Sequence, residues 1–404
     1  RFAKVTFEDT ADYMLGIRLD RGKDKNGMNY IELSHEAPID KMADTAQVKH
    51  HKRVDTPMEP TRMRKKQEGE DDESKYKPPY EYASVLGSVM YIANMTRPDL
   101  VTAVNKLSRF TTNPSHTHFK ALTRLIAFTY QTRERKLRYT QTPHDVEHDP
   151  YRLQVACDSS FSDCLDTQRS TIGRCMWMGK KCSGLIDWKS HLPAQVAQST
   201  TEAEVQAAIE VAKDVVYMRG LLYGIGYPQK GSTRAHIDST ACIAQINALS
   251  GVSKARHYLV ALRKLQEVRH LGIMHTHRVD THDNVSDLFT KPLTVMPYWR
   301  LSSRAMGDKY ADHSHAKFRD EALRQEIGGG SIKSIRRNLQ MQQRMTASDV
   351  PMAMDDKAER KREEMAGKRL STVANIMCMQ LTKALVDAVS KAMSDTDDSC
   401  DGDY

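Results

Sequence analysis

Gln198-Ser-Thr-Thr-Glu-Ala-Glu-Val-Gln-Ala-Ala-Ile209 decides the fold of this chain, because it combines the signals of a helix start with those of a buried helix. Hydroxyl side chains occupy positions 199 to 201, and Ser and Thr are favoured caps of helix N-termini. The apolar residues that follow recur at the three- and four-residue spacing of a helix buried along a wide stripe. They are Val205, Ala208, Ile209, Val211, Ala212, Val215, Val216 and Leu222. We therefore predict a helix over residues 201–223.

The two acids of this helix, Glu202 and Glu204, allow a structural and a functional interpretation. In the structural one, Thr201 and Glu204 form a capping box, in which two side chains three residues apart satisfy each other's backbone N–H groups. In the functional one, the helix carries a carboxylate to a catalytic site. The residues around the helix distinguish the structural interpretation from the functional one.

Short β-like runs flank the helix on both sides. Three precede it and two follow it, at residues 153–158, 169–178, 185–188, 233–238 and 275–279. A helical segment starts at Thr240, and a short helix starts near residues 284–287. The order of three strands, a helix, a strand, helices, a strand and a helix predicts an α/β fold, with a mixed five-stranded sheet and helices on its faces.

Two of these strands end in an acid, Asp158 and Asp238. Strand ends at the centre of such a sheet lie close together, so we expect these two as neighbours, with Glu204 and Asp287 brought to them by the flanking helices. Four carboxylates with no Lys or Arg among them repel one another unless cations lie between them. Oxygen ligands of this kind suit Mg²⁺ or Mn²⁺, and two ions roughly 4 Å apart form a clamp for hydrolysis of a phosphodiester.

Five motifs follow one another along this part of the chain. They are Cys157-Asp158, Arg169-Ser-Thr-Ile-Gly173, Trp188-Lys-Ser190, Ser199-Thr-Thr-Glu-Ala-Glu204 and Ser286-Asp-Leu-Phe-Thr-Lys-Pro-Leu293. In this order they resemble the ribonuclease H domain of copia-type LTR retrotransposon Pol polyproteins. The resemblance implies a ribonuclease H-like fold for residues 150–295, and a metal-dependent endonuclease that hydrolyses the RNA strand of RNA–DNA hybrids with two Mg²⁺ ions. The chain departs from the family at Ser160, where a second acid is usual.

The resemblance also assigns roles to the acids. Asp158, Glu204, Asp238 and Asp287 match the family's four catalytic metal ligands. Glu204 is chosen over Glu202 because Glu-x-Gln-Ala is similar to the retroviral ribonuclease H helix. Glu202 is then a first-turn acid favoured by the helix dipole.

Further candidate residues lie around these acids. His282, in the loop before the fourth acid, is a candidate for product release or proton transfer, although a loop His is more often solvated. Ser239 and the basic residues Lys254, Arg256 and His257 are candidates to contact the nucleic acid, with a solvated polar face as the alternative.

The resemblance divides the rest of the chain into segments. We expect the C-terminal end of a reverse transcriptase palm and thumb at residues 1–60, a charged linker at 61–80, a helical thumb or connection segment at 81–145, and an unrecognised tail, partly helical or disordered, at 296–404. A hairpin signature at residues 13–33 supports the first of these. The paired Asp motif of the polymerase belongs upstream of Arg1, so this chain alone is not expected to polymerise DNA, and the upstream reverse transcriptase domains are expected partners.

Helical apolar spacing and cap signals mark residues 82–94 and the segments that begin at Thr96 and Ser115. Basic residues on them are candidates to face the backbone of a hybrid, although a solvated helix face explains them equally well. These residues are Arg97, Lys106, Arg109, Lys120 and Arg124.

The composition agrees with an intracellular nucleic-acid-binding protein without proving one. The 404 residues carry a formal charge of +8, and the pI is near 9.0. The 7 cysteines show no Cys-x-x-Cys pair, which favours reduced thiols. No apolar run approaches bilayer length and the chain opens on Arg, so we expect a fragment or processed product with no membrane partner. The resemblance places it in a cytoplasmic virus-like particle or in the nucleus.

Two other functions stay open. A decayed or domesticated element would keep the fold and bind nucleic acid without cutting it. An integrase or another nuclease of the same fold is disfavoured, because such sites usually place their acidic helix last, whereas Glu204 lies between the first and third Asp.

Overall fold

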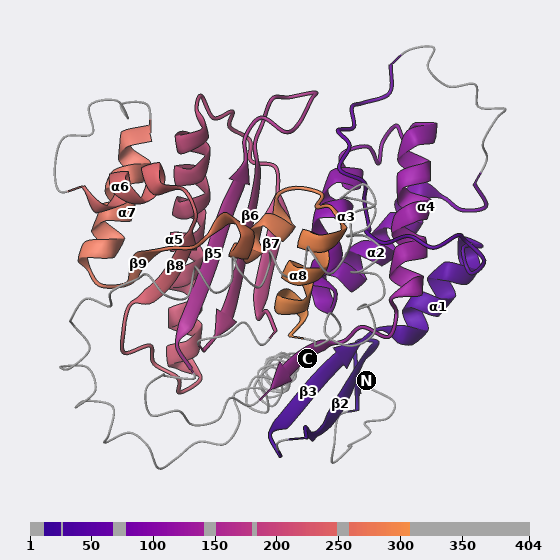
Figure 1. The fold of residues 1–404 in the computed structure, drawn as a ribbon, viewed down its shortest axis with the longest axis horizontal. Coiled ribbons are helices and arrows are strands. Elements are labelled where there is room, and N and C mark those ends of the chain that lie inside the picture. Colours follow the sequence, from indigo (N-terminus) through magenta and orange to yellow (C-terminus); the bar gives the residue numbers. More distant parts are fainter. Residues whose placement is uncertain are drawn as a thin grey trace, which may run out of the picture.

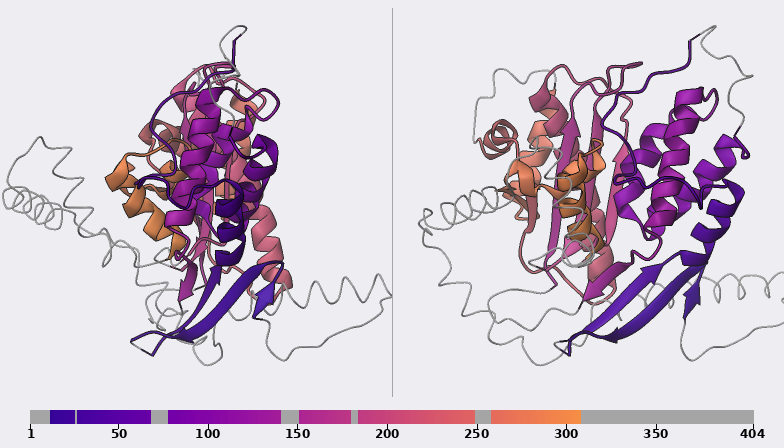
Figure 2. Two further views of the ribbon diagram at one scale, coloured as in Figure 1. Left: turned by 90° about the vertical axis from the view of Figure 1, so that its right-hand side faces the viewer. Right: turned by 45° about the vertical axis from the view of Figure 1, so that its right-hand side comes forward.

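The computed structural model describes residues 12–25, 27–67, 78–140, 151–179, 184–248 and 258–307. These residues form two β-sheets with helices packed beside them (Figure 1). Figure 2 turns the molecule so that the helices of the first half of the chain come toward the viewer beside the larger sheet.

The larger sheet has five strands in the order β7-β6-β5-β8-β9. Its central strand, β5, is antiparallel to β6 and parallel to β8; β6 and β7 pair antiparallel, and β8 and β9 pair parallel. The strands are β5 (Leu153–Ser160), β6 (Thr171–Met178), β7 (Asp187–His191), β8 (Thr233–Ile237) and β9 (Met274–Arg278). This mixed α/β sheet is the ribonuclease H-like arrangement predicted from the sequence, so the fold class is confirmed.

Helix α5 (Thr200–Gly224) packs on one face of this sheet, together with α6 (Thr240–Asn247) and α7 (Leu259–His270). Alternate residues of β5, Cys157 among them, point to this face because side chains alternate along a strand. The bounds of α5 lie within one residue of the helix predicted over 201–223.

The opposite face of the sheet is covered by α8 (Val295–Met306) and the short 3₁₀ helix η4 (Val285–Phe289), which join the helices that precede the sheet in sequence. Those helices are α2 (Tyr82–Met95), η1 (Pro98–Leu100), α3 (Val101–Ser108) and α4 (His116–Gln131). One apolar core connects them to the sheet through Ala156 and Trp177. The expected helical segment at 81–145 therefore shares its core with the sheet domain.

Hydrogen bonds link the same two parts of the chain. Trp188 Nε1, on β7, donates to the carbonyl oxygen of Ala93 over 3.1 Å. The Asn105 amide, on α3, donates to the carbonyl oxygen of Ser190 over 2.9 Å. Strand β7 is the edge of the five-stranded sheet, so the second bond satisfies a backbone carbonyl that an edge strand otherwise leaves open.

A buried ionic cluster ties the helices to α8. Asp99 accepts hydrogen bonds from the side chains of Arg97, Arg135 and Tyr298 over 2.8 to 3.1 Å. Burial acts to raise the pKa of Asp99, but the two guanidinium groups outweigh it and lower that pKa to about 2. Arg97 is only 1% exposed, so the expectation that it faces a hybrid backbone is wrong: its charge is already paired inside the protein.

The N-terminal hairpin is present as strands β2 (Ile17–Lys23) and β3 (Asn29–Ser34), preceded by β1 (Tyr13–Met14) and followed by α1 (Glu36–Thr45). Strand β4 (Leu137–Thr140) pairs antiparallel with β3 and completes a sheet in the order β1-β2-β3-β4. The sequence did not predict β4 as a strand, because four residues carry too short a pattern to be recognised.

Several expectations lie outside the described residues. They concern residues 68–77 of the charged linker, residues 249–257 with Lys254, Arg256 and His257, and the tail beyond residue 307. The first residues of the expected tail form most of α8, and the expected segment boundaries stay predictions. Within the described ranges, no helix is long and apolar enough to cross a membrane.

Candidate active site

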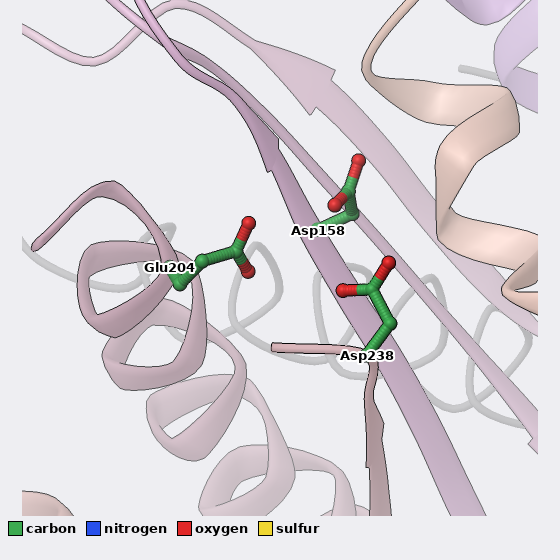
Figure 3. A group of neighbouring side chains, drawn as sticks. All are labelled: Asp158, Glu204 and Asp238. Carbon is green, nitrogen blue, oxygen red and sulfur yellow. The ribbon is translucent and has the colours of Figure 1, made fainter. Parts of the chain in front are cut away.

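Three carboxylates from three elements meet at one end of the larger sheet. Asp158 lies on β5, and Asp238 directly follows β8, which pairs parallel with β5, so the two strands bring their acids to the same edge. Glu204 reaches this edge from the beginning of α5. One carboxylate oxygen of each residue lies within 4.8 Å of the others, and Figure 3 shows the three groups pointing toward one another.

The N-terminus of α5 distinguishes its two acids. Ser199 is the N-cap, and its hydroxyl oxygen accepts the backbone N–H of Glu202 over 3.1 Å. The Glu202 carboxylate in turn accepts the backbone N–H of Gln198 over 2.7 Å. Glu202 therefore forms the cap together with Ser199. The predicted capping box between Thr201 and Glu204 is wrong. Glu204 is left to face the other carboxylates.

Glu204 lies in an environment that disfavours its charged form. Its Oε1 accepts a hydrogen bond of 3.0 Å from the Ser159 hydroxyl, whereas its Oε2 is buried with no hydrogen-bond partner among the described residues. Burial, together with the charges of Asp158 and Asp238, raises the pKa of Glu204 to about 8. Burial and the charge of Asp158 also raise the pKa of Asp238.

Asp287 joins this group through Asp158. It lies in η4, and burial followed by the negative charge of Asp158 raises its pKa to about 7. The ammonium group of Lys291 opposes this effect, because Nζ lies 3.0 Å from Asp287 Oδ1 and 4.0 Å from Asp158 Oδ2. The expectation that no Lys or Arg lies among the four acids is therefore wrong, because Lys291 pairs with Asp287. The four-residue spacing from Asp287 was the signal that could have identified this pair.

The loop that holds Asp287 also orients Asp158. The Thr290 hydroxyl donates a hydrogen bond of 2.6 Å to Asp158 Oδ2. Gly173 lies opposite Asp158 on β6, and a Cβ added there would come within 2.7 Å of the Phe289 Cβ and 2.8 Å of the Phe289 backbone carbon. A glycine at this position thus lets η4 approach the sheet, which explains the Gly of the Arg-Ser-Thr-Ile-Gly motif.

The acidic cluster fits a divalent metal site. Hard oxygen donors, raised carboxyl pKa values and a buried carboxylate oxygen without a partner in the described part of the chain are the features that Mg²⁺ or Mn²⁺ would satisfy. Asp158, Glu204 and Asp238 would hold such ions, and Asp287 lies beside them. Their role as metal ligands stays a prediction.

Two other predicted site residues lie near the cluster. His282 is exposed in the turn η3 (Thr281–Asp283), where its neighbour Thr281 hydrogen-bonds to Asp238. Ser239 is the N-cap of α6, and its hydroxyl oxygen accepts the backbone N–H of Cys242 over 3.2 Å. Ser239 thus has a structural role, whereas its contact with nucleic acid and the function of His282 stay predictions.

The strand order and the acidic cluster together define a ribonuclease H-like domain. No protein-family model matches the chain. The chain is 27% identical over 285 residues to the Pol polyprotein of transposon TNT 1-94 from Nicotiana tabacum, a match that covers 70% of this chain and 20% of that polyprotein. It is also 25% identical over 253 residues to the Pol polyprotein of transposon RE1 from Arabidopsis thaliana, covering 63% of this chain and 16% of that one.

The relatives that match large shares of this chain are thus copia-type and Ty1 retrotransposon Pol polyproteins from plants and yeast, which cover 56% to 72% of it. The chain spans about a fifth or less of the length of the two relatives just described.

A shorter region of the chain is also similar to a protein that is not named as a Pol polyprotein. Over 137 residues the chain is 31% identical to secreted RxLR effector protein 161 from Plasmopara viticola, which covers 34% of this chain and 90% of that protein. Among solved structures, LC11-RNase H1, isolated from compost, aligns at 12% identity and a TM-score of 0.28, over 35% of this chain and 93% of that one. The fold assignment rests on the strand order and not on this alignment.

Proposed function

We propose that this chain is a metal-dependent ribonuclease H, which hydrolyses the RNA strand of RNA–DNA hybrids and leaves 3′-hydroxyl and 5′-phosphate ends. The observation that carries the proposal is the convergence of Asp158, Glu204 and Asp238, with one oxygen of each within 4.8 Å of the others. Three carboxylates this close are unfavourable unless cations are bound between them.

Each residue of the site has a task in this proposal. Asp158, Glu204, Asp238 and Asp287 would hold two Mg²⁺ ions, with Mn²⁺ as a substitute. When bound, the ions supply an activated water and stabilise the charge that develops on the leaving oxygen. Lys291 favours the ionised form of Asp287 by placing a positive charge 3.0 Å from its Oδ1, which limits the rise of the Asp287 pKa.

The remaining assignments concern the substrate and the cellular setting. We propose that His282 assists proton transfer or product release, since it is exposed in the turn that contacts Asp238. We propose that Ser239 and the segment with Lys254, Arg256 and His257 bind the backbone of the hybrid. The upstream reverse transcriptase domains of the same polyprotein would deliver that hybrid in an intracellular particle or the nucleus.

The test is cleavage of a labelled RNA–DNA hybrid by the full chain, with Mg²⁺ and with chelator. The Asp238→Asn variant removes one ligand and is expected to lose activity by at least about a hundredfold. The matched control is Asp283→Asn, an exposed acid in η3 that pairs with Arg304. Cleavage that survives both chelator and Asp238→Asn would rule out the proposal.

A decayed or domesticated protein that binds without cutting is the second candidate. The similarity to an effector protein favours it, because it shows that related sequence occurs in a protein that is not named as a Pol polyprotein. Hybrid binding by the wild-type chain, measured by fluorescence anisotropy in Mg²⁺, with no cleavage over hours would support this candidate. The order of elements, with α5 before β8, continues to disfavour the integrase-type alternative.

A further inference from the structure

A cavity of about 210 Å³ lies where three distant parts of the chain meet beside the acidic cluster. The coil at residues 60–63 forms one wall, α3 contributes Lys106 and Arg109, and the end of β5 with the loop that follows it forms another wall. Lys291 closes the side nearest the acids. The cavity thus lies between the helical segment and the ribonuclease H-like domain.

The charge of this cavity is predominantly positive. Among the described residues that line it, Arg62, Lys106, Arg109 and Lys291 are cations and Asp163 is an acid. The Asp163 carboxylate is already saturated: Oδ1 accepts from the backbone N–H and the hydroxyl of Thr171, each over 2.7 Å, and Oδ2 pairs with Lys106. Asp163 thus compensates Lys106, and Lys291 pairs with Asp287 outside the cavity, so the remaining positive charge comes mainly from Arg62 and Arg109.

Two of the cations are available to a ligand. Arg62 is exposed on the coil wall. Arg109 is held in place by hydrogen bonds of 2.8 Å from Nη2 to Asn105 and Thr171, its Nη1 lies 3.9 Å from Asp163 Oδ2, and its Nε has no hydrogen-bond partner among the described residues. A guanidinium that is oriented in this way on the wall of a cavity is suited to an oxyanion.

The position of the cavity identifies the anion. Ser160, which lines it, lies two residues beyond Asp158 on the same strand. Lys291 also lines it, and the same ammonium group lies 4.0 Å from Asp158 Oδ2. A nucleic-acid strand whose scissile phosphate lies at the acids therefore continues past this cavity, and the phosphodiester is the anion that repeats along that strand.

We propose that this cavity is a phosphate-binding subsite, which holds a backbone phosphate of the bound nucleic acid next to the cleavage site. The proposal rests on the proposed ribonuclease H function for the identity of the strand. It assigns the helical segment a direct part in holding the substrate, because α3 and the coil before α2 supply Arg109 and Arg62. The serine that replaces the usual second acid at position 160 favours the same role, since it adds no negative charge to the cavity wall.

The experiment uses the full chain, a labelled RNA–DNA hybrid and fluorescence anisotropy in chelator at several salt concentrations. Arg62→Ala removes an exposed cation and is expected to weaken binding about fivefold and to reduce the slope of log K against log salt by about 1. Arg62→Lys should restore most of both. The control is Lys230→Ala, because Lys230 is exposed at the opposite end of β8 from Asp238 and should bind like wild type.

Two outcomes would overturn the subsite. One is an Arg62→Ala variant that melts like wild type and binds the hybrid with an affinity and salt slope equal to those of Lys230→Ala. The other is an Arg62→Ala variant that no longer binds inorganic phosphate but keeps the hybrid affinity of the wild type. This result would make the cavity a site for free anions. Binding in chelator needs no catalysis, so a wild-type chain that does not cleave would refute the proposed function and leave this test valid.

Discussion

Lys291 Nζ lies 3.0 Å from Asp287 Oδ1, four residues further along the chain, and so places a positive charge inside a group of carboxylates. The two residues bracket the end of η4, and the hydroxyl of Thr290 between them donates to Asp158. This short segment therefore supplies Asp287 as a candidate ligand, favours the ionised form of its carboxyl group through Lys291, and orients Asp158 through Thr290. Removal of the positive charge should show in the pH dependence of the reaction.

Lys291→Met should shift the acidic limb of the pH–rate profile to higher pH and lower activity at pH 7 about tenfold, since the pKa of Asp287 would rise above its present value of about 7. Hybrid cleavage measured from pH 5 to 9 checks this prediction. Lys291→Arg keeps the charge and should restore the wild-type limb. An unchanged profile in Lys291→Met would show that the ammonium group does not govern Asp287.

Stability without divalent metal should fall as the pH rises from about 6.5 to about 8, a range above that in which the buried His35 and His236, with pKa values lowered to about 4, act in the opposite direction. The folded pKa of Glu204 is raised from 4.5 to about 8, so the folded state holds a proton that the unfolded chain releases. A carboxyl group of this kind contributes stability below its unfolded pKa, and that contribution disappears as the pH passes through the folded pKa. Thermal melting in chelator across this range measures the effect.

Mg²⁺ should reverse this loss, because metal ions favour the ionised carboxylates. We expect the melting temperature at pH 8 to rise by several degrees when Mg²⁺ replaces chelator, and the increase to vanish in Glu204→Gln. In chelator at pH 8, Glu204→Gln should melt higher than wild type, since it removes a buried charge. Equal responses of Glu204→Gln and wild type to Mg²⁺ would argue against Glu204 as a ligand.

Asp99→Asn should destabilise the fold by about 3–5 kcal/mol, because it leaves Arg97 and Arg135 buried without their counter-charge. For a chain of this size the melting temperature should fall by about 10 °C. The control is Glu267→Gln, which breaks the exposed pair with Lys264 and should cost no more than about 1 kcal/mol. Similar melting temperatures for the two variants would mean that the buried cluster contributes little.

Gly173→Ala should lower the rate of hybrid cleavage, although it adds only one methyl group. The added Cβ would lie 2.7 Å from the Phe289 Cβ and 2.8 Å from the backbone of the same residue, so η4 would have to move away from the sheet and carry Asp287 with it. Gly87→Ala is the matched change, since nothing lies within 4 Å of the new Cβ in helix α2, and it should stabilise by up to about 1 kcal/mol. Cleavage rates and melting temperatures of the two variants test whether a Cβ at position 173 displaces η4.

The sequence by itself determined the elements of the ribonuclease H-like domain and the choice of Asp158, Glu204 and Asp238. Each strand and helix carries its own periodicity and end signals, which are local and need no knowledge of the partner elements. The order of the elements then limits the sheet to few topologies, and the central strands bring their terminal acids together. Helix α5 was predictable to within one residue at each end for the same reason.

Only the tertiary structure decided which charged side chains are paired, buried or free. In the sequence, Arg97 and Arg109 are both basic residues on a helical segment, yet the first is enclosed with Asp99 and the second lines a cavity beside the acids. Arg97 and Asp99 are only two residues apart, but their burial is set by Arg135 and Tyr298, which come from distant parts of the chain, and local patterns carry no record of such contacts.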